Sequence, residues 1–310
     1  MTDYLVSFVI PCYRSSKTIE NVVQEIAETM KNRNYEIILV NDASPDKTFD
    51  VISELCKDNS RIVGVNLNEN FGQHAALMAG FHHVHGDVIV CLDDDGQTPA
   101  CEVNKLLKEI EDGKDAVYAK YPKKMHSSFR NFGSKVNDWM LRVMLNKPKN
   151  LVVSSYFAVK RLIVDEIIRY TNPYPYVIGL VLRSTKNVCN VEVNHRERTE
   201  GASGYTFGKL LALWINGFTA FSVKPLRIAT GIGGLMAIVS FIYGIVTIVM
   251  KIVGLNYVLG FSALMTVVTF IGGLNLLMMG IIGEYIGRIY ISLNRSPQFI
   301  IKEIIDHRDQ

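Results

Sequence analysis

The sequence predicts an α/β protein: a mostly parallel sheet flanked by helices, followed by an amphipathic interface helix and two transmembrane helices. In the first half, apolar runs rich in β-branched residues alternate with segments of helical periodicity. Such alternation is typical of parallel sheets. Near the end of the chain, two long stretches carry no charged residue. They indicate a membrane anchor, since about 20 apolar residues span a bilayer.

The elements of the first half follow from these patterns. Strands are predicted at residues 5–10, 36–41, 62–67 and 88–92, with further strands near 155–159 and 188–193. An apolar stripe predicts a helix over residues 18–32, a proline begins a second over 99–112, and a third is expected near 131–145. Both of the first two helices are expected to cover faces of the sheet.

The last third carries the membrane signals. Apolar residues at helical spacing, with Lys209 and Lys224 beside them, predict an interface helix over residues 205–224. The charge-free stretches at 228–250 and 252–283 predict a two-helix hairpin. Basic residues precede the first span and follow the second, so both termini are expected in the cytosol. The predicted divisions are a catalytic domain at 1–204, the interface helix at 205–224, the hairpin at 225–287 and a cytosolic tail at 288–310.

Composition excludes some classes of protein. The 33 basic and 30 acidic residues leave a net charge of +3, which disfavours a nucleic-acid binder. The five cysteines are widely spaced and form no CxxC pair, so reduced thiols in a cytosolic domain are expected. The N-terminal apolar run is too short for a signal peptide and is interpreted as the first buried strand.

Three adjacent carboxylates follow the fourth predicted strand, in the segment VIVCLDDDGQTP. Asp93, Asp94 and Asp95 should therefore lie at the carboxyl edge of a parallel sheet, where α/β folds bind ligands. The three carboxylates repel one another, and a divalent cation bound between them would offset this repulsion. Oxygen ligands suit Mg²⁺ or Mn²⁺, with Asp93 and Asp95 converging. A solvated acidic turn is the alternative.

Two further strand ends are expected at the same edge. The first strand ends in IPCYR and the second in VNDASPDKT, which brings Pro11, Tyr13 and Asp42 toward the acidic cluster. An aromatic face for stacking and a carboxylate acceptor are what a nucleotide base and ribose require. This convergence favours a ligand site over a solvated turn.

Together these motifs, in order with NFGQHAALMAGF, RTEGASGYTFGKLL and FSVKPLR, resemble the polyprenyl-phosphate glycosyltransferases of glycosyltransferase family 2. The family has a GT-A fold and includes dolichyl-phosphate mannose synthases and undecaprenyl-phosphate sugar transferases. The resemblance implies an inverting, metal-dependent enzyme. It would move one sugar from a nucleoside diphosphate sugar to a polyprenyl phosphate at the cytosolic face of a bacterial inner membrane or a plasma membrane.

The resemblance also implies roles for residues on the donor side. The metal and donor diphosphate would be bound by Asp93, Asp95 and Gln97. Asp94 fills a slot that is often alanine and is assigned to the nucleotide sugar, together with Pro11, Tyr13 and Asp42.

On the acceptor side, the family arginine of RxxGxS matches Arg198, which is expected near the reaction centre and is assigned, with Asp95, to catalysis. The lipid phosphate is assigned to Arg198 and to the region of Arg130, Ser134 and Lys135.

The chain departs from the family pattern at two motifs. Arg14 and Ser15 stand where the first motif usually continues with Asn-Glu, and Gly204 replaces the lysine of SKY. The first departure falls at a nucleotide or metal-adjacent contact of the family, and the second removes a phosphate-binding lysine.

Several alternatives stay open. A UDP-hexose such as UDP-glucose is the expected donor, GDP-mannose is the alternative donor, and a noncatalytic membrane scaffold is the alternative class. Small residues in the spans favour a homo-oligomer. The cluster of His82, His83 and His85 lacks the partners of a zinc site and is interpreted as packing and dipole interaction at a helix end.

Overall fold

The computed structural model describes residues 4–121, 142, 147–148, 150–194, 261–294 and 297–308, with single positions between 231 and 253. The chain divides into two compact units. The first comprises Met1–Thr206 with Arg295–Gln310, and the second comprises Phe207–Asn294. The C-terminal residues therefore belong to the same unit as the N-terminal strands.

The first unit is built on an eight-stranded mixed sheet with the order β7-β5-β6-β4-β1-β2-β3-β8. The neighbours β4, β1, β2 and β3 run parallel. The strand β8 joins β3 antiparallel, and β6 joins both β4 and β5 antiparallel. The strands are Val6–Cys12 (β1), Tyr35–Asn41 (β2), Ile62–Leu67 (β3), Val88–Cys91 (β4), Ala116–Lys120 (β5), Phe157–Lys160 (β6), Val188–Glu192 (β7) and Ile301–Ile305 (β8).

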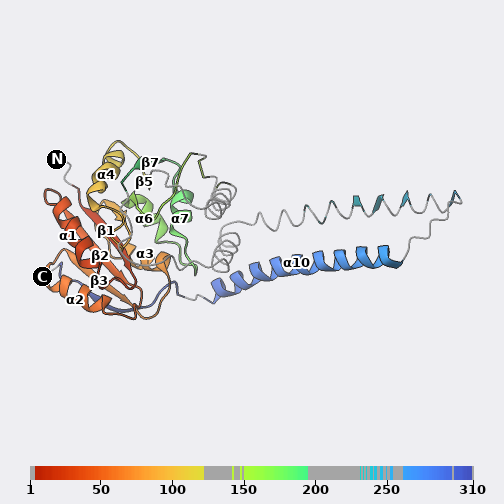
Figure 1. Ribbon diagram of the computed structural model, residues 1–310, viewed down its shortest axis with the longest axis horizontal. Helices are drawn as coiled ribbons and strands as arrows, with labels where there is room; N and C mark the ends of the chain where they lie inside the picture. Colours follow the sequence, from red (N-terminus) through yellow and green to blue (C-terminus); the bar gives the residue numbers. More distant parts are fainter. Residues whose placement is uncertain are drawn as a thin grey trace. The chain divides into compact units, whose positions relative to one another are not determined.

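Helices cover both faces of this sheet (Figure 1). One face shares a single apolar core with α1, α2 and α4, whereas α3 packs on the other face over β1 and β2, with α6 and α7 beside it. The helices are Ile19–Thr29 (α1), Thr48–Asp58 (α2), Gln73–Phe81 (α3), Val103–Glu111 (α4), Arg161–Ile167 (α6) and Val177–Ser184 (α7), with a short 3-10 turn at Ala100–Glu102 before α4. The predicted helix near 131–145 lies outside the described residues apart from Arg142, which is helical.

The helix α3 lies unusually close to the sheet at Gly80. A Cβ atom at this position would stand 2.4 Å from Cγ1 of Val9 and 3.1 Å from Cγ2 of Val40. Only a residue without a side chain allows the helix to approach this far. The approach matters for the site because the first residue of α3 is Gln73, at the carboxyl edge of the sheet.

The C-terminal strand β8 is the main departure from the predicted organisation, which placed a tail at residues 288–310. Its five residues, IKEII, pair with β3 so that Ile301 lies opposite Leu67 at the carboxyl edge and Ile305 lies opposite Gly64. An edge strand with charged residues on its exposed positions gives no strong periodic signal. The charged residues Lys302 and Glu303 lie on exposed positions of this edge strand.

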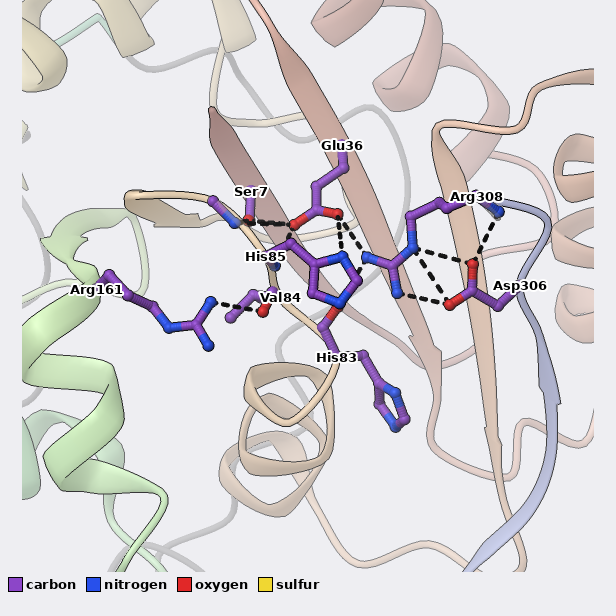
Figure 2. Close-up of polar contacts among 9 residues, drawn as sticks. Ser7, Glu36, His83, Val84, His85, Arg161, Asp306 and Arg308 are labelled. Atoms are coloured by element: carbon purple, nitrogen blue, oxygen red, sulfur yellow. Dashed lines mark hydrogen bonds and ion pairs between the residues drawn. The ribbon is translucent and has the colours of Figure 1, made fainter. Parts of the chain in front are cut away.

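Beyond β8, Arg308 binds the amino edge of the sheet (Figure 2). Its Nη1 donates to Oε2 of Glu36 at 2.5 Å and to the carbonyl oxygen of His83 at 2.9 Å, and its Nη2 donates to Asp306 at 2.6 Å. Glu36 also accepts a hydrogen bond from the Ser7 hydroxyl. The C-terminal segment thus runs along β3 from the carboxyl edge of the sheet to its amino edge.

In the second unit, the described helix α10 spans Phe261–Leu293. Its stretch Phe270–Gly287 is long and apolar enough to cross a membrane, the one such helix within the described residues. The predicted charge-free span at 252–283 overlaps this helix, and residues 254–260 of it lie outside the described residues. The described helix continues past the end of the charge-free stretch, through Glu284 and Arg288 to Leu293, because a charge-free run reports composition and not helical hydrogen bonding. The predicted interface helix at 205–224 lies outside the described residues.

Candidate functional site at the carboxyl edge of the sheet

The three aspartates follow β4 directly, at the carboxyl edge of the parallel strands. The Asp93 carboxylate is held from two sides: Nε2 of Gln73 donates to one oxygen at 2.9 Å, and the hydroxyl of Ser155 donates to the other. Burial, followed by repulsion from Asp95 and Asp94, raises the pKa of Asp93 to about 6 despite these donors. A positively charged group beside Asp93 would therefore stabilise the ionised carboxylate.

Asp94 turns toward the end of β1. One of its oxygens accepts hydrogen bonds from the amide of Tyr13, at 3.0 Å, and from the hydroxyl of Ser15. Burial raises the pKa of this carboxyl group as well. Asp94 thus ties the strand end that carries Tyr13 to the strand end that carries the acidic cluster.

Asp95 is bonded to Gln97 within the turn that Gly96 makes. Its two oxygens accept hydrogen bonds from the backbone amide of Gln97 at 3.1 Å and from the side-chain Nε2 at 2.6 Å. Gly96 adopts a φ of 68°, a conformation that glycine favours. The turn consequently holds two of the residues assigned to metal and diphosphate next to each other.

At the end of β2, the Asp42 carboxylate accepts hydrogen bonds from the amides of Phe71, at 2.8 Å, and Gly72, at 2.9 Å. These amides lie immediately before α3, so Asp42 fixes the start of the helix that carries Gln73. Burial raises the pKa of Asp42, although both amides oppose the shift. The carboxylate predicted to meet a nucleotide therefore already has a structural task.

The loop after β1 presents an aromatic ring to solvent. The Tyr13 side chain is 45% exposed, and the Arg14 guanidinium carbon lies 5.5 Å from the centre of its ring. Arg14 has a φ of 60° and Ala43, at the end of β2, a φ of 47°. Left-handed conformations in residues other than glycine are costly and cluster at functional sites. Pro11, by contrast, lies buried inside β1, opposite Val40.

Several residues of this edge were not assigned to the site from the sequence. Gln73, Ser15 and Ser155 are uncharged and come from three different segments, so no motif groups them. The hydroxyl of Tyr121, just past β5, lies 3.3 Å from that of Thr98 and near the acidic turn. Only the position of each residue beside a strand or helix end could have identified it.

The remaining assigned residues are Arg130, Ser134, Lys135 and Arg198, and all four lie outside the described residues.

The three histidines follow the end of α3. The helix α3 ends at Phe81, so the histidines lie at a helix end, as predicted. Burial lowers the pKa of His82 and of His83. A lowered pKa disfavours the charged imidazole that an interaction with the helix dipole requires. Across the part of the chain that the structure describes, no group of three or more His, Cys, Asp or Glu side chains could hold a metal ion.

The fold and the acidic edge together define a glycosyltransferase of the GT-A type. The family model for glycosyl transferase family 2 matches residues 7–168, more than half of the chain. A model of the GtrB C-terminal hairpin matches residues 224–289, which makes the protein membrane-associated through this hairpin. The chain belongs to glycosyl transferase family 2.

Curated relatives match along almost the whole chain. An undecaprenyl-phosphate 4-deoxy-4-formamido-L-arabinose transferase of Klebsiella pneumoniae (strain 342) is 30% identical, covering 97% of this chain and 93% of its own. The transferase of the same name from Proteus mirabilis (strain HI4320) is 29% identical, covering 97% and 94%.

Among solved structures, glucosyl-3-phosphoglycerate synthase from Mycobacterium tuberculosis resembles the fold. It aligns with a TM-score of 0.54 over 70% of this chain and 78% of its own, at 18% identity. At that identity the similarity concerns the fold alone.

Proposed function

We propose that the protein transfers one sugar from a nucleoside diphosphate sugar, with a UDP sugar as donor, to a polyprenyl phosphate, with inversion at the anomeric carbon. The observation that carries this proposal is the acidic end of β4, where Asp93 accepts a hydrogen bond from Gln73, Asp94 from Tyr13, and Asp95 from Gln97 of its own turn. The named relatives support undecaprenyl phosphate as the acceptor.

On the donor side, we assign the base to the exposed ring of Tyr13, and the ribose and diphosphate to the acidic edge. Asp94 holds the Tyr13 amide, so it orients the stacking surface as well as contributing charge nearby. Asp42 acts through α3, because its carboxylate is bonded to the two amides that precede that helix. Pro11 would contribute through the shape of the buried strand end.

The residues present fit a divalent cation. Asp93 and Asp95 offer hard oxygen ligands, and Mg²⁺ is commonly bound by one or two carboxylates with substrate phosphates completing its shell. Burial raises the pKa of Asp93, repulsion from Asp95 and Asp94 adds to the shift, and a cation at this edge would offset that repulsion. Gln97 would hold Asp95 in place and present its amide oxygen. Mg²⁺ or Mn²⁺ would stabilise charge on the leaving diphosphate. The M. tuberculosis neighbour has been solved with Mn²⁺ and UDP-glucose.

The acceptor needs no strong general base. A phosphate monoester has a second pKa of about 6 and is largely ionised at neutral pH. Catalysis then consists of aligning the acceptor oxygen with the anomeric carbon and stabilising the leaving group. We assign Arg198 to the second task and Arg130, Ser134 and Lys135 to the lipid phosphate, because cationic and hydroxyl side chains bind phosphate oxygens.

The proposal is tested with the full-length protein in lipid nanodiscs containing undecaprenyl phosphate. A panel of UDP and GDP sugars, including UDP-glucose, a UDP-linked pentose and GDP-mannose, is supplied with Mg²⁺ or Mn²⁺, and lipid-linked sugar is measured by mass spectrometry. We expect one UDP sugar to give product, chelation by EDTA to abolish it, and Asp95→Ala to lower the rate at least about 100-fold.

The matched control is Asp50→Asn, since Asp50 is an exposed carboxylate in the first turn of α2. Its rate should equal that of the wild type. Product from GDP-mannose alone would replace the proposed donor. The absence of product with every donor, together with unchanged behaviour of the Asp95→Ala protein in membranes, would leave the scaffold interpretation in place of an enzyme.

A further inference from the structure

The loop between α6 and α7 exposes an aromatic residue in a strained conformation. Tyr174 is 67% exposed and has a φ of 58°, and it stands between Pro173 and Pro175. Bulky residues rarely adopt the left-handed region, because Cβ then crowds the following carbonyl group. The energetic cost of holding a tyrosine in this conformation, with its ring in solvent, indicates a function for the ring.

This loop is fastened by the segment that follows α10. Nε2 of Gln298 donates hydrogen bonds to the carbonyl oxygens of Tyr170, at 2.5 Å, and Asn172, at 2.8 Å. The helix α10 ends at Leu293, and five residues of extended chain reach at most about 18 Å. The covalent chain alone therefore limits how far Gln298, and with it the loop, can lie from the end of the apolar helix.

The same segment enters the sheet at the carboxyl edge. The amide of Asn68 donates to the carbonyl oxygen of Ile300 at 2.9 Å, and Ile301 pairs with Leu67 at the end of β3. At the other end of the loop, the ring of Tyr176 lies 4.9 Å from that of His74, the residue after Gln73 in α3. The loop therefore lies beside the edge that carries the acidic cluster.

We propose that the loop of residues 170–176, the 170–176 loop, contacts the membrane and places the ring of Tyr174 in the lipid headgroup layer. Tyrosine is enriched at this level because its ring is apolar and its hydroxyl group remains hydrated. Contact there would hold the acidic edge at the height of a lipid phosphate. The proposal goes beyond the transfer reaction and depends only on the membrane hairpin.

Two tryptophan variants in nanodiscs made with brominated phospholipids test the contact directly. Tyr174→Trp is compared with Leu162→Trp in a full-length protein whose native tryptophans are replaced by Trp139→Phe and Trp214→Phe. Leu162 is 70% exposed, but it lies at the amino edge, where the amide of Arg161 donates to Asp87. We expect at least about twofold quenching at position 174 and none at 162. Equal quenching at the two positions, or none at 174, overturns the proposal.

The unmodified protein gives an independent measurement. In nanodiscs containing a photoactivatable phospholipid, the peptide that covers the 170–176 loop should be labelled and the peptide that covers Leu162 should not. A loop peptide without label overturns the proposal even if the tryptophan variants do not fold. Both measurements detect lipid, so they decide the inference even if no donor sugar is ever found to react.

Where transfer is observed, Tyr174→Ser separates lipid contact from donor binding. The variant should raise the KM for undecaprenyl phosphate in bilayers several-fold and leave the KM for the nucleotide sugar unchanged. A raised KM for the nucleotide sugar instead would assign the ring to the donor site and overturn the membrane contact.

Discussion

At the scale of single residues, the Asp94 carboxylate holds a neighbouring part of the sheet edge in place. Its oxygen accepts hydrogen bonds from the Tyr13 amide and the Ser15 hydroxyl. The serine that departs from the family pattern thus contacts the acidic cluster directly. Asp94, at a position often occupied by alanine in the family, is its partner, so the two departures act together.

This pairing makes a prediction about nucleotide binding. Asp94→Ala removes the acceptor that holds the Tyr13 strand end, so we expect UDP affinity, measured by calorimetry, to fall about tenfold, as expected for the loss of a hydrogen bond to a charged group. Asp94→Asn keeps an acceptor oxygen and should lose less. Ser16→Ala is the control, because Ser16 bonds Asp46 away from the cluster. Equal losses in the Ala and Asn variants would mean that the charge of Asp94 acts on the ligand itself.

At the scale of elements, the close contact of α3 with the sheet holds Gln73 in place at the carboxyl edge. Gly80→Ala would place a methyl group 2.4 Å from Cγ1 of Val9, which forces the helix outward. We expect a loss of about 1 to 3 kcal/mol in the free energy of unfolding, measured by thermal melts of the full-length protein in detergent. Transfer activity should fall as well, because Gln73 moves with the helix.

The double variant Gly80→Ala with Val9→Ala is the matched control, since it removes the methyl group that the new Cβ meets. It should be more stable than the sum of the two single changes predicts, because residues in contact are coupled. Strict additivity would show that the helix shifts without meeting Val9.

The elements also show what the sequence could and could not predict. The strands at residues 36–41, 62–67 and 88–92 were predicted within one or two residues, because each is buried on both faces and reads as a continuous apolar run. Strands β5 and β8 were not predicted. In β8, an edge strand, exposed charges interrupt the apolar pattern. The acidic cluster followed from the strand ends, whereas Gln73 and Ser155 become its neighbours only through tertiary packing.

At the scale of the whole molecule, Arg308 joins the last residues to the amino edge of the sheet. Burial raises the pKa of Glu36, but hydrogen bonds from Ser7, the His85 amide and Arg308 outweigh it, so the pKa lies below its usual value. A carboxyl group of this kind contributes stability that is present above its usual pKa and lost as the pH falls through its folded pKa.

Arg308→Met should therefore destabilise the protein at neutral pH and have a smaller effect in acid. The side chains of Arg308 and Glu36 are 13% and 4% exposed, and breaking such a buried pair costs about 3 kcal/mol or more. Thermal melts at pH 7 and below pH 4 measure the difference, which should shrink as the pH falls through the lowered pKa of folded Glu36. Lys302→Met, on an exposed position of β8, is the control and should match the wild type at both values. A penalty for Arg308→Met that does not depend on pH would exclude the ion pair as its cause.

The pairing of β8 with β3 also has a consequence for biosynthesis. The strand that completes the sheet is translated after the hairpin, so the outer edge of β3 stays unpaired while the apolar segments are made. Exposed strand edges invite aggregation. The sheet is complete only when residues 301–308 have been made, after the apolar segments that precede them. Premature termination within the hairpin would thus leave an unfinished sheet as well as a missing anchor.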